Sequence, residues 1–190
     1  GYEAAGASAI QLEDQVFPKK CGHTPNRKVI PAEDMVRKIR VAVEARSNKD
    51  FLIVARTDAR TEHGLDEALR RAEMYGKAGA DILFVESPES EDEMRVICER
   101  VEKPLLANMV EGGRTPVKSR VVLEQLGYRI AIFPITAMLA ATEAMAAVYG
   151  TLKSDGSSSD MKQPLYPFSN LSTLMGFQDV WDFERKYAED

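Results

Sequence analysis

A thiol flanked by basic residues occurs early in the sequence, in the segment KKCGH at residues 19–23. Cys21 follows two lysines there, and the apolar run SAIQLE just upstream leads into two adjacent acids, Glu13 and Asp14. Nearby positive charge lowers the pKa of a thiol, and such a thiol can transfer a proton to or from a substrate. Taken alone, the segment fits an inert cysteine in a polar surface loop better than a catalytic thiol. The groups that converge on it decide between the two interpretations.

Further candidate residues stand at or just after the ends of the apolar runs that follow: Gln15, Arg56, Thr57, Asp58, Glu86, Asn108, Pro134 and Thr136. In a parallel barrel the carboxyl ends of the strands meet on one rim, where catalytic groups gather. Carboxylate and amide oxygens suit Mg²⁺, and a guanidinium suits a substrate carboxylate. The set therefore predicts a divalent metal and a polycarboxylate substrate. The plainer alternatives are a structural ion pair between Arg56 and Asp58, and ordinary strand-exit or turn roles for Glu86 and Asn108.

The elements that must position these groups alternate between strand and helix. Short apolar runs without strict alternation predict strands that are buried on both faces; they span residues 8–13, 50–56, 81–87, 104–109 and 129–134. Amphipathic segments with capping and stop signals predict helices; these span residues 31–47, 65–80, 90–102, 117–127 and 137–154. Strand and helix repeated in this way indicate right-handed βαβ units with a parallel sheet.

Five such units are too few to close a (β/α)8 barrel, which takes about 250 residues. No GxGxxG turn follows any of the strands, which argues against an open doubly wound sheet. We therefore expect residues 1–154 to form the later part of a TIM-type barrel. The polar, turn-rich segment 155–164 predicts an exposed connection, so residues 155–190 are expected to form a linker and a C-terminal helical arm.

The bulk composition disfavours several classes of partner. The 190 residues carry 25 basic and 30 acidic side chains, a net charge of −5, whereas nucleic acids and anionic membranes bind basic surfaces. No apolar run approaches the roughly 20 residues of a transmembrane helix, and no signal segment is visible, so a cytoplasmic location is expected. Cys21 and Cys98 are far apart in the sequence, which predicts free thiols in a reducing compartment.

The motifs taken together are more specific than any one of them. The chain resembles the isocitrate lyase/phosphoenolpyruvate mutase superfamily, and within it the methylisocitrate lyase and 2,3-dimethylmalate lyase branch. The resemblance covers nearly the whole chain, from about residue 6. Six motifs carry it, in the family's order and approximate spacing: QLEDQ (11–15), KKCGH (19–23), VARTDA (54–59), LFVES (83–87), LLANM (105–109) and FPIT (133–136).

The resemblance implies cleavage of a carbon–carbon bond in a 2-hydroxy polycarboxylate with Mg²⁺, or alternatively Mn²⁺, as cofactor. One product would be a 2-oxo acid such as pyruvate or glyoxylate, and the other would leave as a carboxylate-stabilised carbanion. By resemblance, Cys21 is the general acid that protonates this carbanion. Lys20 and His23 would tune the thiol.

The same resemblance assigns the binding residues. Gly22 would let the loop fold closely over the ligand, Arg56 would pair with a substrate carboxylate, and Glu86 and Asn108 would hold the other carboxylate or the developing charge. Glu13 would contact the metal through its water shell. The family's first three strands and the aspartates nearest its metal precede the QLEDQ motif. We therefore expect only the fourth to eighth strands here, with the other metal ligands upstream of residue 1.

Three functional alternatives follow from the resemblance. Members that transfer phosphorus, and oxaloacetate decarboxylases, generally lack the cysteine of KKCGH, so Cys21 favours a lyase. A carboxyphosphonoenolpyruvate mutase and oxaloacetate hydrolases keep a similar loop, so these reactions form the second alternative. A non-catalytic fragment or assembly partner is the third. The C-terminal helical segment matches a region that relatives exchange between subunits, which implies a homodimer or homotetramer.

Overall fold

The first part of the chain is a parallel α/β structure. In a computed structural model, residues 1–22, 24 and 26–188 are described, and they divide into two compact units, residues 1–136 and 137–190. The described strands of the first unit are β1 (Ala9–Glu13), β2 (Leu52–Thr57), β3 (Ile82–Val85), β4 (Leu106–Asn108) and β5 (Ile130–Ile132). Each strand runs parallel to the next in the sequence, in the pairs β1–β2, β2–β3 and β4–β5, and the parallel bridge between Leu83 and Leu105 joins β3 to β4.

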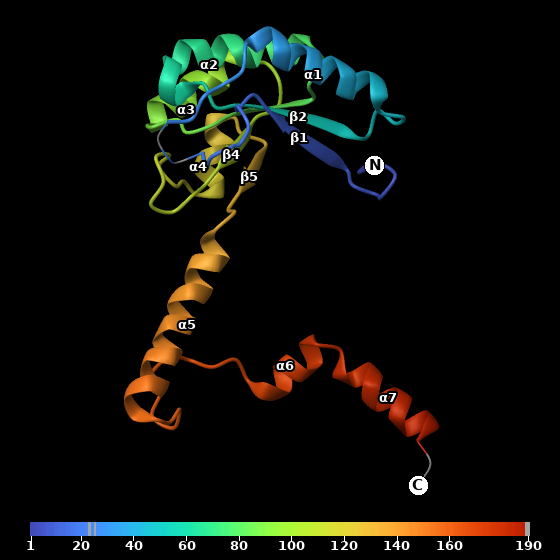
Figure 1. The fold of residues 1–190 in the computed structure, drawn as a ribbon, viewed down its shortest axis with the longest axis vertical. Helices are drawn as coiled ribbons and strands as arrows, with labels where there is room; N and C mark the ends of the chain where they lie inside the picture. The colour runs from blue at the N-terminus through green and yellow to red at the C-terminus, as the bar shows by residue number, and fades with distance from the viewer. Residues whose placement is uncertain (23, 25, 189–190) are drawn as a thin grey trace. The chain divides into compact units, whose positions relative to one another are not determined.

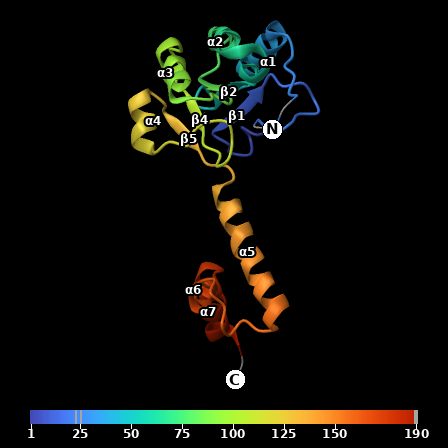
Figure 2. The ribbon, with the colours of Figure 1, turned by 90° about the vertical axis from the view of Figure 1, so that its left-hand side faces the viewer.

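Helices connect successive strands and cover one side of the sheet (Figures 1 and 2). They are α1 (Ala32–Ala45), α2 (Arg60–Lys77), α3 (Glu91–Arg100) and α4 (Arg120–Leu126). Strand neighbours that follow sequence order are typical of a barrel, whereas a doubly wound sheet reverses its strand order. The predicted parallel α/β fold is confirmed, and all five predicted strand regions and the helices between them are present.

Local sequence signals explain where these helices begin and bend. Ser90 accepts a hydrogen bond from the backbone N–H of Glu93, as the capping-box pattern predicts, but the Glu93 carboxylate accepts from the N–H of Glu89 instead of reaching Ser90. Helix α2 begins five residues before the predicted residue 65 because Gly64, at φ 83°, joins a first turn to the main helix. A positive φ of this kind is accessible to glycine at little cost.

The core of the first unit lies between the sheet and these helices. Met35, Ile39, Tyr75, Leu83 and Ile97 are among its fully buried side chains. Such burial contributes roughly 1.5–3 kcal/mol for each large apolar side chain. The apolar faces predicted from the helical spacing are therefore the faces that pack.

A buried carboxylate ties this core to the strand ends. The Oδ2 atom of Asp14 accepts hydrogen bonds from Thr57 Oγ1 at 2.7 Å, Tyr75 OH at 2.7 Å and Arg71 Nη1 at 3.1 Å. Its Oδ1 atom accepts from the backbone N–H of Asp58 at 2.9 Å. Burial and the charge of Asp14 raise the pKa of the Tyr75 hydroxyl well above its ordinary value, so that hydroxyl stays protonated as a donor. The carboxylate therefore joins β1, β2 and α2.

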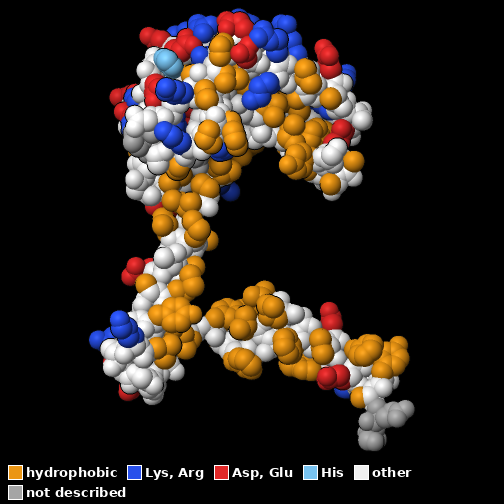
Figure 3. Space-filling model, in the orientation of Figure 1, with side chains coloured by type: hydrophobic (Ala, Val, Ile, Leu, Met, Phe, Trp, Pro, Cys, Tyr) orange, Lys and Arg blue, Asp and Glu red, His pale blue; other side chains and the backbone are white. Residues whose placement is uncertain are grey.

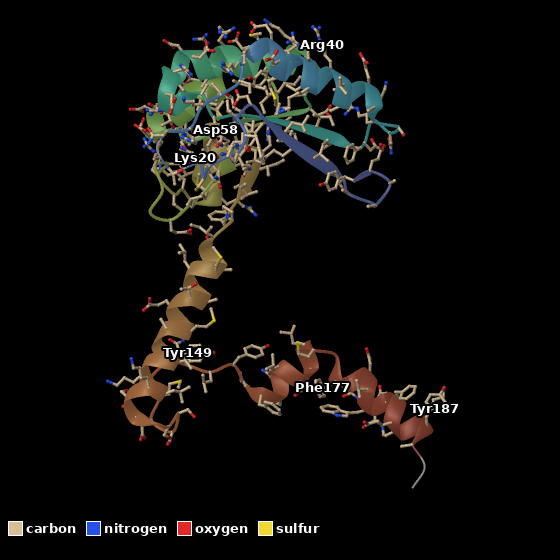
Figure 4. All side chains as sticks on the ribbon, in the orientation of Figure 1. Lys20, Arg40, Asp58, Tyr149, Phe177 and Tyr187 are labelled. Carbon is tan, nitrogen blue, oxygen red and sulfur yellow. The ribbon has the colours of Figure 1, made fainter. Side chains whose placement is uncertain are left out.

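The second unit consists of helices α5 (Thr136–Asp155), whose first residue belongs to the first unit, α6 (Phe168–Leu174) and α7 (Phe177–Tyr187). The single helical region predicted after residue 170 is divided at Gly176, which has a left-handed φ of 78°. Within the described residues 137–188 no apolar side chain is fully buried. Orange apolar atoms accordingly line these helices in Figure 3, and the side chains of Phe177 and Tyr187 project from α7 in Figure 4. No described helix is both long and apolar enough to span a membrane.

We predict that Asp14→Ala lowers the free energy of unfolding by about 3–5 kcal/mol, because it removes one of the two carboxylates that pair with Arg71 and leaves the buried donors of Thr57, Asp58 and Tyr75 without their acceptor. Tyr75→Phe, the matched control, removes one donor to the same oxygen and should cost only about 0.5–1.5 kcal/mol. Urea unfolding followed by circular dichroism measures both. Equal losses in the two variants would show that the carboxylate does not tie these elements together.

Candidate active site

The ends of three neighbouring strands bring an arginine, an acid and an amide together. Arg56 is the second-to-last residue of β2, and its Nη1 atom lies 3.1 Å from Oε2 of Glu86, which directly follows β3. The Nδ2 atom of Asn108, the last residue of β4, donates to the same oxygen at 3.2 Å. The side chain of Glu86 is fully buried and that of Arg56 is 10% exposed. The structure thus brings together the three side chains that the sequence assigns to carboxylate binding.

Arg56 is also held from its other edge. Its Nε and Nη2 atoms donate to the two oxygens of Asp58, each at 2.8 Å, which is a bidentate pairing. Its guanidinium lies 5.0 Å from the centre of the Phe84 ring. Burial opposes the charged form of Arg56, but the bonds to Asp58 and the charge of Glu86 outweigh it and raise its pKa. Arg56 is therefore a fixed and permanently charged group at the rim.

The thiol loop folds directly over these strand ends. The side chain of Gln15, just after β1, accepts from the backbone N–H of Lys20 and donates to the Lys20 carbonyl at 3.1 Å. At the other side, Ser87 Oγ lies 2.7 Å from the carbonyl oxygen of Gly22. The side chain of Cys21, between these two anchors, is exposed. The loop is thus tied to β1 and β3 while its thiol stays accessible.

The contact between the loop and the rim requires a glycine. A Cβ atom at Gly22 would lie 2.7 Å from Arg56 Nη2 and 2.8 Å from Glu86 Cδ, closer than real Cβ contacts allow. The main chain therefore approaches the arginine–glutamate pair in a way that no other residue permits. The structure thus places Gly22 against Arg56 and Glu86, and the close folding of the loop over a ligand stays a prediction.

The two lysines and the histidine of KKCGH have different surroundings. Lys19 Nζ lies 3.1 Å from the Glu13 carboxylate, and Lys20 Nζ donates to the carbonyl oxygen of Asn26 at 2.9 Å. Lys20 and Asp58 are labelled in Figure 4. His23, the third residue that we assign to the thiol's chemistry, lies outside the described residues. The tuning of Cys21 by Lys20 and His23 stays a prediction.

The described residues fit an outer contact to a metal ion and not a complete site. Glu13, at the end of β1, has a largely buried carboxylate that Arg56 Nε approaches to 3.6 Å. Within residues 1–22, 24 and 26–188, no cluster of three or more His, Cys, Asp or Glu side chains could hold a metal ion. Glu13 alone supplies a carboxylate of the kind that Mg²⁺ prefers, usually through retained water.

Sequence reasoning missed two members of the site. From the sequence, Asp58 is only a strand-end residue and a candidate structural partner of Arg56. In the structure its carboxylate binds two arginines, because Arg27 Nη1 also donates to its Oδ1 atom at 2.8 Å. Arg27 itself is fully buried, which its position in the polar segment NRK does not suggest. The available signal was the apolar Val29 and Ile30 that follow, because they predict that the chain re-enters the core there.

Comparisons with known proteins agree with this geometry. The family model described as phosphoenolpyruvate phosphomutase matches residues 2–153. A 2,3-dimethylmalate lyase of Eubacterium barkeri is 50% identical over 187 residues, covering 98% of this chain and 65% of the relative. A 2-methylisocitrate lyase of Aeropyrum pernix is 46% identical over 187 residues, covering 98% of this chain and 59% of the relative. The chain therefore spans about three-fifths of the length of these relatives.

Solved structures show the same fold. A crystal structure of a 2,3-dimethylmalate lyase, described as a PEP mutase/isocitrate lyase superfamily member, has a TM-score of 0.86 at 34% identity and covers 97% of this chain and 62% of its own. A phosphonopyruvate hydrolase in complex with oxalate and Mg²⁺ has a TM-score of 0.81 at 28% identity and covers 99% and 65%. Since the family model matches four-fifths of the residues, the chain belongs to the phosphoenolpyruvate phosphomutase family, within the PEP mutase/isocitrate lyase superfamily.

Proposed function

We propose that this chain supplies the proton donor and the carboxylate-binding groups of a carbon–carbon lyase that acts on a 2-hydroxy polycarboxylate of the 2,3-dimethylmalate or 2-methylisocitrate type. The observation that carries the proposal is the close approach of Gly22 to Arg56 and Glu86, because it sets the thiol loop against the groups that bind carboxylate. The printed names of the two relatives support the same reaction class.

In the proposed reaction, the substrate's hydroxyl gives its proton to solvent, from which the Cys21 thiolate is reprotonated at the end of the cycle, and the bond to the neighbouring carbon breaks. The oxygen becomes the carbonyl of a 2-oxo acid such as pyruvate or glyoxylate, and the electron pair of the broken bond stays on the departing carbon. Cys21 gives the Sγ proton to that carbon and becomes a thiolate. Arg56 holds a substrate carboxylate through the N–H groups that Asp58 and Glu86 leave free, since a guanidinium has five donors.

The remaining residues of the site hold charge in place. Asn108 and Glu86 would face the other carboxylate or the developing charge, and the low exposure of the rim strengthens these interactions. Mg²⁺, or alternatively Mn²⁺, would supply neutralisation of the 2-oxo acid end, with Glu13 in its water shell. A structure of a family neighbour with oxalate and Mg²⁺ supports the choice of metal. We propose in addition that residues 1–154 form the later part of a TIM-type barrel and that the protein is cytoplasmic.

A second candidate is a reaction at phosphorus or the hydrolysis of oxaloacetate. The description of the matching family model and the phosphonopyruvate hydrolase among the structural neighbours favour it. The thiol separates the lyase most clearly from a phosphoryl-group rearrangement, because such a rearrangement leaves no carbanion for Cys21 to protonate. A non-catalytic assembly role is the third candidate, and it predicts no turnover of any of these substrates.

The first test is turnover of 2,3-dimethylmalate and 2-methylisocitrate with Mg²⁺, followed by pyruvate release. We expect Cys21→Ser to lower kcat by about 100-fold or more, because general acid catalysis contributes that much and a serine hydroxyl is a far weaker acid. Cys98→Ser is the matched control and should keep kcat within about threefold. Full activity in Cys21→Ser would reject the lyase mechanism and favour the second candidate.

The two thiols should also differ in their chemical reactivity. Cys21 is exposed, whereas burial raises the pKa of Cys98 to about 11. At pH 8 only about one Cys98 side chain in a thousand is then a thiolate, the form that iodoacetamide attacks. We predict selective alkylation of Cys21 at pH 8, read by peptide mass spectrometry, with Cys98 labelling rising about tenfold per pH unit towards pH 11. Equal labelling of both at pH 8 would contradict the burial of Cys98.

We also propose that a second copy of this chain covers the apolar faces of α6 and α7, giving a homodimer or homotetramer. The exposure of Val180 and Trp181, at 50% and 42%, supports this because scattered apolar residues are common on monomers but a continuous apolar face is not. We predict that Val180→Ser with Trp181→Ser lowers the molar mass measured by light scattering to that of one chain. The control Asp182→Ser should leave the mass unchanged. An unchanged mass in the double variant would place the interface elsewhere.

A further inference from the structure

Arg27 is a fully buried charged side chain that the proposed reaction does not use. The exposed fraction of its side chain is zero, as is that of its partner Asp58. Its Nη1 atom donates to Asp58 Oδ1 at 2.8 Å, and its Nη2 atom donates to the hydroxyl of Thr61 in the first turn of α2. Burying an arginine is costly unless its charge is paired, so this arrangement needs an explanation.

Arg27 reaches Arg56 through one shared carboxylate. Oδ1 of Asp58 accepts both from Arg27 Nη1 and from Arg56 Nη2, each at 2.8 Å, while Oδ2 accepts from Arg56 Nε. The backbone N–H of Asp58 is in turn fixed by Asp14. Arg27 therefore holds the Asp58 carboxylate at the one orientation that engages two nitrogens of Arg56.

The charges at the rim give Arg27 a second role. Arg56 faces three carboxylates, Asp58, Glu86 and the more distant Glu13, and Glu13 is also paired with Lys19. The two cations and three carboxylates of this group carry one net negative charge. The positive charge of Arg27, paired with Asp58, brings the group to neutrality. A substrate carboxylate that approaches Arg56 then meets no net repulsion, and at low exposure such a difference is large because the surroundings screen it weakly.

The loop that carries the thiol also delivers Arg27. The backbone N–H of Val16 donates to the Lys28 carbonyl at 2.8 Å, and the N–H of Ile30 donates to the Asp14 carbonyl at 2.8 Å, so the base of the loop is closed beside β1. Arg27 sits at this closed base and Cys21 at the exposed part. One segment therefore provides both the proton donor and the charge beneath the carboxylate-binding arginine.

We propose that Arg27 is a positioning residue for substrate binding: through Asp58 it orients Arg56, and its charge offsets the net negative charge of the group around Arg56. The inference rests on the proposed function of the rim as a carboxylate-binding site. It concerns affinity for the anion and not the proton transfer, because Arg27 acts on Arg56 and does not contact Cys21 in the described hydrogen bonds.

The test compares Arg27→Met and Arg27→Lys with Arg46→Met. Arg46 is the matched control because it is also largely buried and pairs with a carboxylate, Asp81, at 2.6 Å, but Asp81 lies by the amino-terminal ends of the strands, where its carboxylate accepts from the N–H of Ile53. Two quantities are measured in each protein with Mg²⁺ present: the dissociation constant of oxalate by titration calorimetry, and KM and kcat for the lyase substrate. Oxalate binding does not depend on turnover, so it tests the inference even where the proposed reaction fails.

We expect Arg27→Met to raise the oxalate dissociation constant and KM roughly tenfold or more with kcat within about threefold, the pattern for loss of uniform binding. Arg27→Lys should restore most of the affinity, because it keeps the charge. Arg46→Met should lower the unfolding midpoint and leave both constants unchanged. Equal oxalate affinity in the parent and Arg27→Met, absence of binding in both, failure of lysine to restore affinity, or an equal effect in Arg46→Met would each overturn the inference. Oxalate binding without turnover would instead reject the lyase and leave Arg27 assigned.

Discussion

The structure of the site depends on the hydrogen bonds of one buried carboxylate, that of Asp14. Asp14 directly follows β1, and its carboxylate accepts hydrogen bonds from the end of β2 and from α2. The backbone carbonyl of Asp14 accepts from the N–H of Ile30 at the base of the thiol loop. Arg71 bonds both the Asp14 carboxylate and the Ile30 carbonyl, so the same helix fixes the strand end and the loop. An ion pair at low exposure is costly to form and costly to break. This cost makes the register between the loop and the strands difficult to change.

A second layer of charge is built on that base. Asp58, whose N–H is bonded to Asp14, holds Arg56 on one side and Arg27 on the other. Arg56 in turn pairs with Glu86, which also accepts from Asn108 at the end of β4. Positive and negative groups alternate in the order Arg27, Asp58, Arg56 and Glu86, so each buried charge has a partner of opposite sign. The guanidinium of Arg56 is therefore held by two acids and not by one. Preorganisation of this kind lets a site bind an anion without first rearranging its own dipoles.

Much of this could be predicted from the sequence, because strand ends are local features. The apolar runs gave the five strands, and the parallel topology placed Arg56, Glu86 and Asn108 on one rim. What could not be predicted depends on contacts between distant segments. Arg27 lies in a polar loop, and only the closure of that loop against β1 and α2 shows that it is buried on Asp58. The division between α6 and α7 at Gly176 could not be predicted for a different reason. A glycine within a helical pattern can either continue the helix or adopt the left-handed conformation that ends it.

The balance of donors and acceptors at the rim explains which part of the chemistry these residues can perform. Arg56 has more N–H groups than its two carboxylate partners use. The Oδ1 atom of Asn108 is buried without a hydrogen-bond partner among the described residues, and the thiol of Cys21 in the adjacent loop is exposed. By contrast, the Glu13 carboxylate lies between Lys19, at 3.1 Å, and the Nε atom of Arg56, at 3.6 Å. The other rim acids, Asp58 and Glu86, already accept hydrogen bonds or ion pairs from arginines, so fewer of their lone pairs remain for another ligand. The rim is therefore suited to holding carboxylates and giving a proton.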